Sequence, residues 1–116
     1  MWSAAPSPGW YDACMPELIL TVRRVGDHES RTEEYEMSYS IGNGASRELK
    51  VKYQAARAYE INAALDAAVE VSRSVISEEK PDLRQPTDER LSQFAWRTIQ
   101  SSKYEAGEAV TSRLEL

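Results

Sequence analysis

The sequence predicts an α+β protein in which an antiparallel β-hairpin packs on two long antiparallel helices, in the order ββαα. Three observations favour this fold. Polar and apolar residues alternate over residues 33–41, as in a strand with one buried and one wet face. An apolar run rich in β-formers precedes that strand. Two segments of helical periodicity follow it, the first of them rich in alanine.

The length of the chain suits one domain with a modest core, because it has 116 residues of which 41% are hydrophobic. Residues 1–14 differ in composition from the rest and hold two prolines and two tryptophans. They have no basic start followed by a continuous apolar run, so they do not match a secretory signal. We expect a flexible leader there, or an arm that packs on the domain or on a partner. We place the domain at residues 15–116.

The predicted hairpin consists of residues 17–25 and 31–41. In the first strand, Leu18, Leu20 and Val22 share one face. A polar segment that begins with Gly26 forms the loop. In the second strand, the face expected to be buried consists of Tyr35, Met37, Tyr39 and Ile41. The face expected to meet solvent consists of Glu34, Glu36, Ser38 and Ser40.

The first helix is predicted to run from Ser46, as N-cap, to Glu79. Its apolar stripe includes Leu49, Tyr53 and Ile61, and its many alanines favour a helix. Two prolines in residues 80–86 then bar continuation of the helix.

Thr87 is the predicted N-cap of the second helix, whose apolar stripe begins at Leu91 and continues to Val110 and Leu114. Gly107 weakens the last part of this helix by about 1 kcal/mol relative to alanine. We therefore expect the end of the helix to kink or fray.

The predicted architecture also favours a homodimer. A 34-residue helix would be about 50 Å long and would overshoot a compact domain. A two-stranded sheet is marginal in water and leaves pairing groups open at its edges. Joining two copies across a twofold axis solves both problems. The strand over residues 33–41 would then join a second copy or another protein through its open edge.

No catalytic constellation is evident in the sequence. The single histidine, His28, stands in the hairpin loop, and the single cysteine, Cys14, stands near the start. One cysteine allows no intrachain disulfide, which suits a reducing, cytoplasmic location. Glu33 and Glu34 are neighbours in a strand, so they face opposite ways and cannot act as a pair. We predict a non-enzyme without cofactor or metal.

A small-ligand site or enzyme at residues 42–44 is an alternative. This Gly42-Asn43-Gly44 loop would lie between a strand and a helix N-terminus, where free N–H groups can bind phosphate. The dinucleotide-binding motif needs a third glycine at position 47, where this sequence has Arg47. The Gly-Lys-Ser/Thr ending of the phosphate-binding loop is also missing. A tight turn with positive φ explains these glycines equally.

Nucleic-acid binding is a second alternative. Four basic residues cluster at the predicted start of the first helix: Arg47, Lys50, Lys52 and Arg57. The net charge of −5 argues against general affinity for phosphate backbones. No apolar run is long enough to span a membrane.

The leading expectation is therefore an acidic protein–protein interaction module, acting as an adaptor, inhibitor or assembly component through its helical faces and sheet edge. Trp96 and Tyr104 lie off the core stripe of the second helix, and aromatic residues dominate interface hot spots. Tyr59, Ala63 and Ala67 mark a surface of the first helix that a second helix could approach. The expected partners are a second copy and an unidentified protein.

Overall fold

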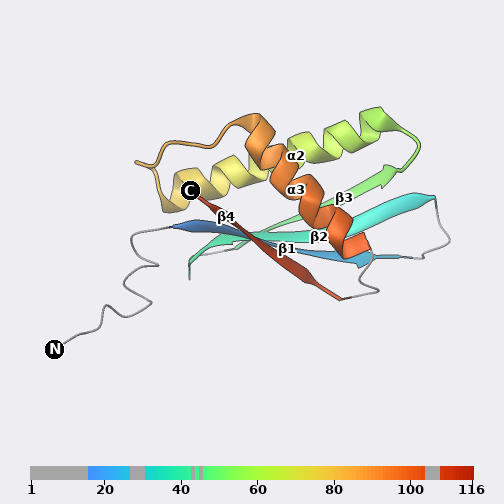
Figure 1. The fold of residues 1–116 in the computed structure, drawn as a ribbon, viewed down its shortest axis with the longest axis horizontal. Helices are drawn as coiled ribbons and strands as arrows, with labels where there is room; N and C mark the ends of the chain where they lie inside the picture. The colour runs from blue at the N-terminus through green and yellow to red at the C-terminus, as the bar shows by residue number, and fades with distance from the viewer. Residues whose placement is uncertain (1–15, 27–30, 43, 45, 104–107) are drawn as a thin grey trace.

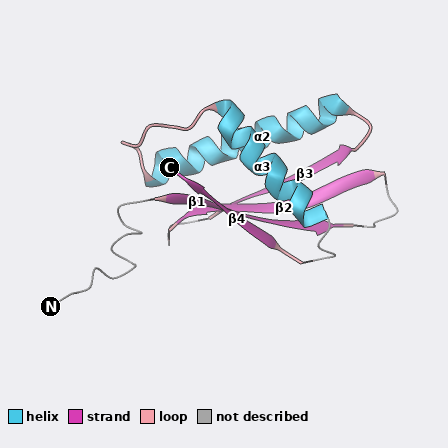
Figure 2. Cartoon of the chain, viewed as in Figure 1, coloured by secondary structure: helices cyan, strands magenta, loops and turns pink. Residues whose placement is uncertain are grey.

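Four antiparallel strands form one sheet, and two helices lie on one of its faces in the computed structural model of the chain (Figure 1). The structure describes residues 16–26, 31–42, 44, 46–103 and 108–116. Figure 2 shows the two layers. The predicted α+β class is confirmed. The elements are β1 (Glu17–Val25), β2 (Thr32–Ile41), β3 (Arg47–Gln54), α2 (Ala58–Glu79), α3 (Asp88–Lys103) and β4 (Val110–Glu115).

The predicted hairpin is present as β1 and β2. They pair antiparallel from Leu18 opposite Ile41 to Val25 opposite Glu34. Buried residues alternate without a break along β2, and its apolar face is buried as predicted. The loop residues 27–30, with His28, lie outside the described residues, as do residues 1–14 with Cys14.

The predicted start of the first helix at Ser46 is wrong. Residues Arg47–Gln54 form strand β3, which pairs with β2 from Tyr39 opposite Arg47 to Thr32 opposite Gln54. Helix α2 begins only at Ala58 and has 22 residues. The physical reason is that β2 needs a second neighbour for its backbone groups, and the apolar side chains of β3 alternate as a strand requires.

The predicted length of the second helix is also wrong. Helix α3 ends at Lys103, and Val110–Glu115 form strand β4, which pairs with β1. The predicted cap is confirmed, because the Thr87 hydroxyl accepts a hydrogen bond from the backbone N–H of Arg90 at 3.2 Å. Among the described helices, none is long and apolar enough to cross a membrane.

The core fills the space between the helices and the inner face of the sheet. β1 and β2 supply most of the large buried side chains, which include Leu20 and Tyr39, and the helices cover them with residues such as Ile76 and Leu91. Full burial of such a side chain contributes about 1.5–3 kcal/mol. Both described helices lie over the inner face, so neither covers the outer one (Figure 1).

The order β3-β2-β1-β4 places β2 inside the sheet and leaves β3 and β4 at the edges. The expected role of residues 33–41 as an open edge is therefore wrong, because both sides of β2 are paired within the chain. The two-stranded sheet that favoured a homodimer is replaced by a four-stranded one. The homodimer itself stays a prediction.

Candidate functional site

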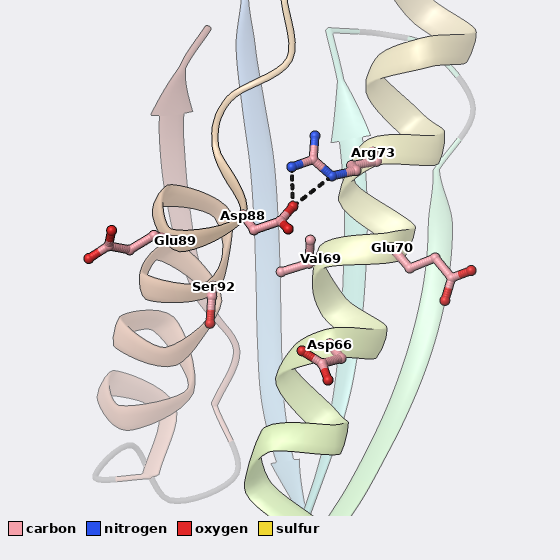
Figure 3. Close-up of a pocket in the computed structure, with 7 residues that line it drawn as sticks. All are labelled: Asp66, Val69, Glu70, Arg73, Asp88, Glu89 and Ser92. Carbon is pink, nitrogen blue, oxygen red and sulfur yellow. Dashed lines mark hydrogen bonds and ion pairs between the residues drawn. The ribbon is translucent and has the colours of Figure 1, made fainter.

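A groove runs between α2 and α3 (Figure 3). Its volume is about 450 Å³. The lining residues of α2 recur at three- and four-residue spacing, which places them on one helix face. Strand β1 lies behind the two helices in this view. The lining consists of Asp66, Val69, Glu70, Arg73, Asp88, Glu89 and Ser92.

The groove is acidic, with four carboxylate side chains against one guanidinium. Arg73 pairs with Asp88 across the groove, and its Nε lies 3.0 Å from the carboxylate oxygen (Figure 3). Asp88 and Glu89 occupy the first turn of α3, where the helix dipole favours negative charge. Asp66 and Glu70 have no ion pair with any residue that the structure describes. The groove therefore offers free negative charge to a cationic partner.

These carboxylates do not form a metal site. Among the described residues, no group of three or more histidine, cysteine, aspartate or glutamate side chains could hold a metal ion. Val69 of α2 is the one apolar side chain among the described residues that line the groove. Apart from Val69 and Ser92, every residue of the lining carries a charged side chain.

A second polar cluster lies inside the molecule, around Glu33. Its carboxylate is 3.1 Å from the Arg24 guanidinium, 3.7 Å from the Lys103 ammonium group, and accepts a hydrogen bond from the Tyr35 hydroxyl at 3.1 Å. The side chains of Arg24 and Glu33 are both less than a tenth exposed. The alternation of β2 places residue 33 on the inner face, and that signal in the sequence could have identified a buried carboxylate.

Burial keeps the phenols of this cluster protonated. Desolvation is the largest cause that raises the pKa of Tyr35, and the nearby Tyr53 and Glu33 raise it further. Desolvation likewise raises the pKa of Tyr53, whose ring centroid is 6.0 Å from that of Tyr35. The Glu33 carboxylate forms an ion pair with both Arg24 and Lys103. The cluster is thus a paired structural element that holds the end of α3 on the sheet.

The described residues of the predicted partner interface differ in their exposure. Trp96 is half-buried and packs on the core, with its ring centroid 6.4 Å from that of Tyr53. Tyr59 is 66% exposed in the first turn of α2. Ala63 is exposed and Ala67 is half-buried on the same helix. Tyr104 lies outside the described residues.

The four basic residues do not converge as the nucleic-acid alternative requires. Three of them belong to β3, so the premise of a basic helix start is wrong. Arg47 donates to Glu78 and Arg57 donates to Glu60, at 2.9 and 3.2 Å. The other two stand opposite glutamates of β2: Lys50 opposite Glu36, and Lys52 opposite Glu34.

The glycine loop precedes a strand instead of a helix, so the premise of a phosphate site at a helix N-terminus is also wrong. Gly42 has a φ of 60°, which explains the glycine by backbone geometry. A Cβ at Gly44 would meet the Glu79 carboxylate at 2.5 Å. That negative group beside the loop disfavours an anionic ligand.

Comparison of the chain with protein-family models, curated proteins and solved structures found no match. The acidic groove was not predicted from the sequence. On each helix its charged residues lie beside the apolar stripe, where charged side chains are expected to face solvent. The sequence of either helix alone therefore gives no sign of a groove. Only the packing of α2 beside α3 brings the two sets of carboxylates together.

Proposed function

We propose that this protein is a non-enzymatic protein–protein interaction module whose groove between α2 and α3 binds a basic segment of another protein. The observation that carries this proposal is the pair of free carboxylates, Asp66 and Glu70, on the rim of a groove that also contains Val69. Lysine and arginine side chains of a partner would gain charge-assisted contacts there. Their aliphatic stems would cover the apolar surface.

The charge of the groove favours a protein partner over nucleic acid. Phosphate backbones are bound mainly through lysine and arginine, and four carboxylates would repel them. The overall charge of −5 adds an attractive field for a basic partner and speeds its association. Small-molecule pockets are mostly apolar and enclosed, whereas charged side chains dominate this lining.

The non-enzymatic part of the proposal rests on the polar cluster at Glu33. Catalytic acids and bases need a proton-accepting or proton-donating group that the substrate can reach. Glu33 is 6% exposed and engaged by two cations and a phenol. As an adaptor, inhibitor or assembly component, the protein would need only its surfaces.

The test is capture of partners from a lysate of the source cells, with three forms of the full chain as bait. The first is the unchanged protein, and the second carries Asp66→Lys and Glu70→Lys. The third carries Glu108→Lys and Glu115→Lys, which change the net charge equally at exposed positions outside the groove. Mass spectrometry would identify the captured proteins, and calorimetry would measure affinity for the purified partner.

We expect a stoichiometric protein with a basic segment to bind the first and third forms and not the second. Raised salt should weaken that binding, because the attraction is electrostatic. Equal capture by all three forms would rule out the groove. If the unchanged chain captures no stoichiometric protein, the proposed function is wrong.

A further inference from the structure

The two edges of the sheet differ in how much open backbone they offer. Neighbouring residues of a strand point their N–H and C=O groups to opposite sides. Leu116 donates to Pro16 on the β1 side, so the backbone groups of Glu115 point to the free edge of β4. The Arg90 guanidinium donates to that Glu115 carbonyl at 2.9 Å and occupies part of this edge.

Within the described part of the chain, the edge at β3 is closed only at its last residue. Ala55 donates to Arg31, so odd-numbered residues of β3 point their backbone groups to β2 and even-numbered residues point theirs outward. The outward N–H of Gln54 donates to the Glu60 carboxylate at 3.2 Å. The outward groups of Glu48, Lys50 and Lys52 have no partner among the residues that the structure describes, so they form an open ladder. An open ladder of this kind is a template for another strand.

We propose that β3 pairs antiparallel with β3 of a second copy, with Leu49 on the twofold axis. This register places Glu48 of each copy opposite Lys50 of the other, and each such pair exchanges two backbone hydrogen bonds. Leu49 then meets Leu49 of the second copy on the inner face of the sheet. The short sequence Glu48-Leu49-Lys50 is thus complementary to itself under a twofold axis.

The neighbouring registers of β3 are unfavourable. A twofold axis at Glu48 or at Lys50 would place that charged residue opposite its own copy. An axis at Val51 would place Lys50 opposite Lys52. Like charges directly opposite each other destabilise a strand pair. Charge complementarity therefore favours the Leu49 register over those centred on residues 48, 50 and 51.

The edge at β4 is less suited to the same pairing. A twofold axis at Leu114 would place Arg113 opposite Glu115, which is a favourable combination of charges. That pair would exchange its backbone hydrogen bonds through the outward groups of both residues. The Glu115 carbonyl already accepts the hydrogen bond from Arg90, so this register would have to displace the guanidinium. The open ladder of β3 requires no such displacement.

The helical layer permits this approach. Glu60 and Glu78 of α2 contact β3 residues, so they mark the flank of α2 on the β3 side. Helical spacing places Ala67, Val71 and Ser74 on the same flank. Small side chains allow two helices to pack at about 8–10 Å. The helices of two copies could therefore lie side by side over the extended sheet.

The acidic groove would stay open in this dimer. Two of its α2 residues, Asp66 and Arg73, point toward α3, whereas Glu70 points away from α3 on the other side of α2 (Figure 3). The dimer proposal does not depend on the groove binding a partner. A dimer would present two grooves, so a partner with two basic segments would gain affinity from both.

The test uses complementary charge reversals in the full chain, Glu48→Lys and Lys50→Glu, with mass measured by light scattering over a concentration series. Each single variant places like charges opposite each other twice and should weaken the dimer about tenfold or more. An equimolar mixture of the two variants restores opposite charges in every pair, so it should form a heterodimer, which native mass spectrometry would detect. The double variant should dimerise as the unchanged protein does.

Lys50→Glu also places a second carboxylate opposite Glu36 within the chain, so thermal unfolding of each variant must accompany the mass measurements. Glu48→Lys stands opposite Ser38 and carries no such cost. Arg113→Glu on β4 is the matched control and should leave the dimer intact. The proposal is wrong if the unchanged protein stays monomeric at all concentrations. It is equally wrong if the mixture of variants forms no heterodimer while both variants remain folded.

Discussion

Glu33 and Arg24 form an ion pair inside the protein, with 3.1 Å between the carboxylate oxygen and the guanidinium nitrogen. The two residues lie on neighbouring strands, β2 and β1, and both side chains are less than a tenth exposed. A buried pair of this kind contributes little net stability, but the loss of one partner leaves a charge in the interior. The pair therefore constrains which residues can stand at these positions.

Replacement of Glu33 by alanine should lower the free energy of unfolding by about 3 kcal/mol, because Arg24 and Lys103 would lose their shared carboxylate. Urea unfolding followed by circular dichroism measures this difference. Glu34→Ala on the outer face is the control and should cost far less. A loss below about 1 kcal/mol for Glu33→Ala would show that water or other groups replace the carboxylate.

The protein should lose stability as the pH rises above 10. Burial raises the pKa of Tyr39 from its ordinary value of 10.0 to about 12, so the unfolded chain releases this proton first. The contribution of Tyr39 to the free energy of unfolding is fully present below pH 10 and is lost as the pH rises toward 12. The slope for one tyrosine is about 1.4 kcal/mol per pH unit. Tyr35 and Tyr53 add to the loss, since their pKa values are raised too.

Urea unfolding at a series of pH values from about 8 to about 12 would measure this decline, with Tyr39→Phe as the comparison. The Tyr39 hydroxyl is buried without a regular hydrogen bond among the described residues. Ser72 is close enough to lower its pKa slightly, but donates its own proton to the Ala68 carbonyl at 2.8 Å. Tyr39→Phe should therefore keep or raise stability near neutral pH and flatten the alkaline decline. An unchanged slope would contradict the assignment to Tyr39.

Gly42→Ala should lower the free energy of unfolding by about 1–2 kcal/mol, because alanine is strained in the left-handed region that Gly42 occupies. Gly42→Asn should cost less, since asparagine tolerates this conformation. Nothing described lies within 4 Å of a Cβ built at Gly42, so the cost comes from the backbone alone. Thermal unfolding of the two variants gives the comparison. Equal losses in both would point to a cause other than the φ angle.

Arg90→Ala should open the edge of β4 by freeing the Glu115 carbonyl. We expect a larger tendency to associate at high concentration, with little change in thermal stability, since an exposed hydrogen bond contributes about 1 kcal/mol. Light scattering against concentration measures the association. Arg97→Ala, on the same helix and exposed, serves as the control. Equal association of the two variants would show that Arg90 does not block pairing at the edge of β4.

The sequence predicted the hairpin well because the faces of β1 and β2 differ so clearly. The sequence wrongly predicted a helix over residues 46–57, because Leu49 and Tyr53 are four residues apart and fit both a helix and a strand. The alternation of Glu48, Lys50 and Lys52 with apolar neighbours was the stronger signal. Strand β4 is short, so its alternation is a weak signal in the sequence, and its pairing partner β1 is far away along the chain. In both β3 and β4, pairing with a neighbouring strand outweighs the local preference for a helix.

The pairing of β1 with β4 has a consequence for synthesis of the protein. Val22 is made long before its neighbour Val110, at about 5–20 residues per second. During that interval β1 and β2 can pair with each other while the far side of β1 has no partner. Nascent chains would then be most vulnerable to association on a crowded polysome, and slow translation between α3 and β4 would prolong the exposure.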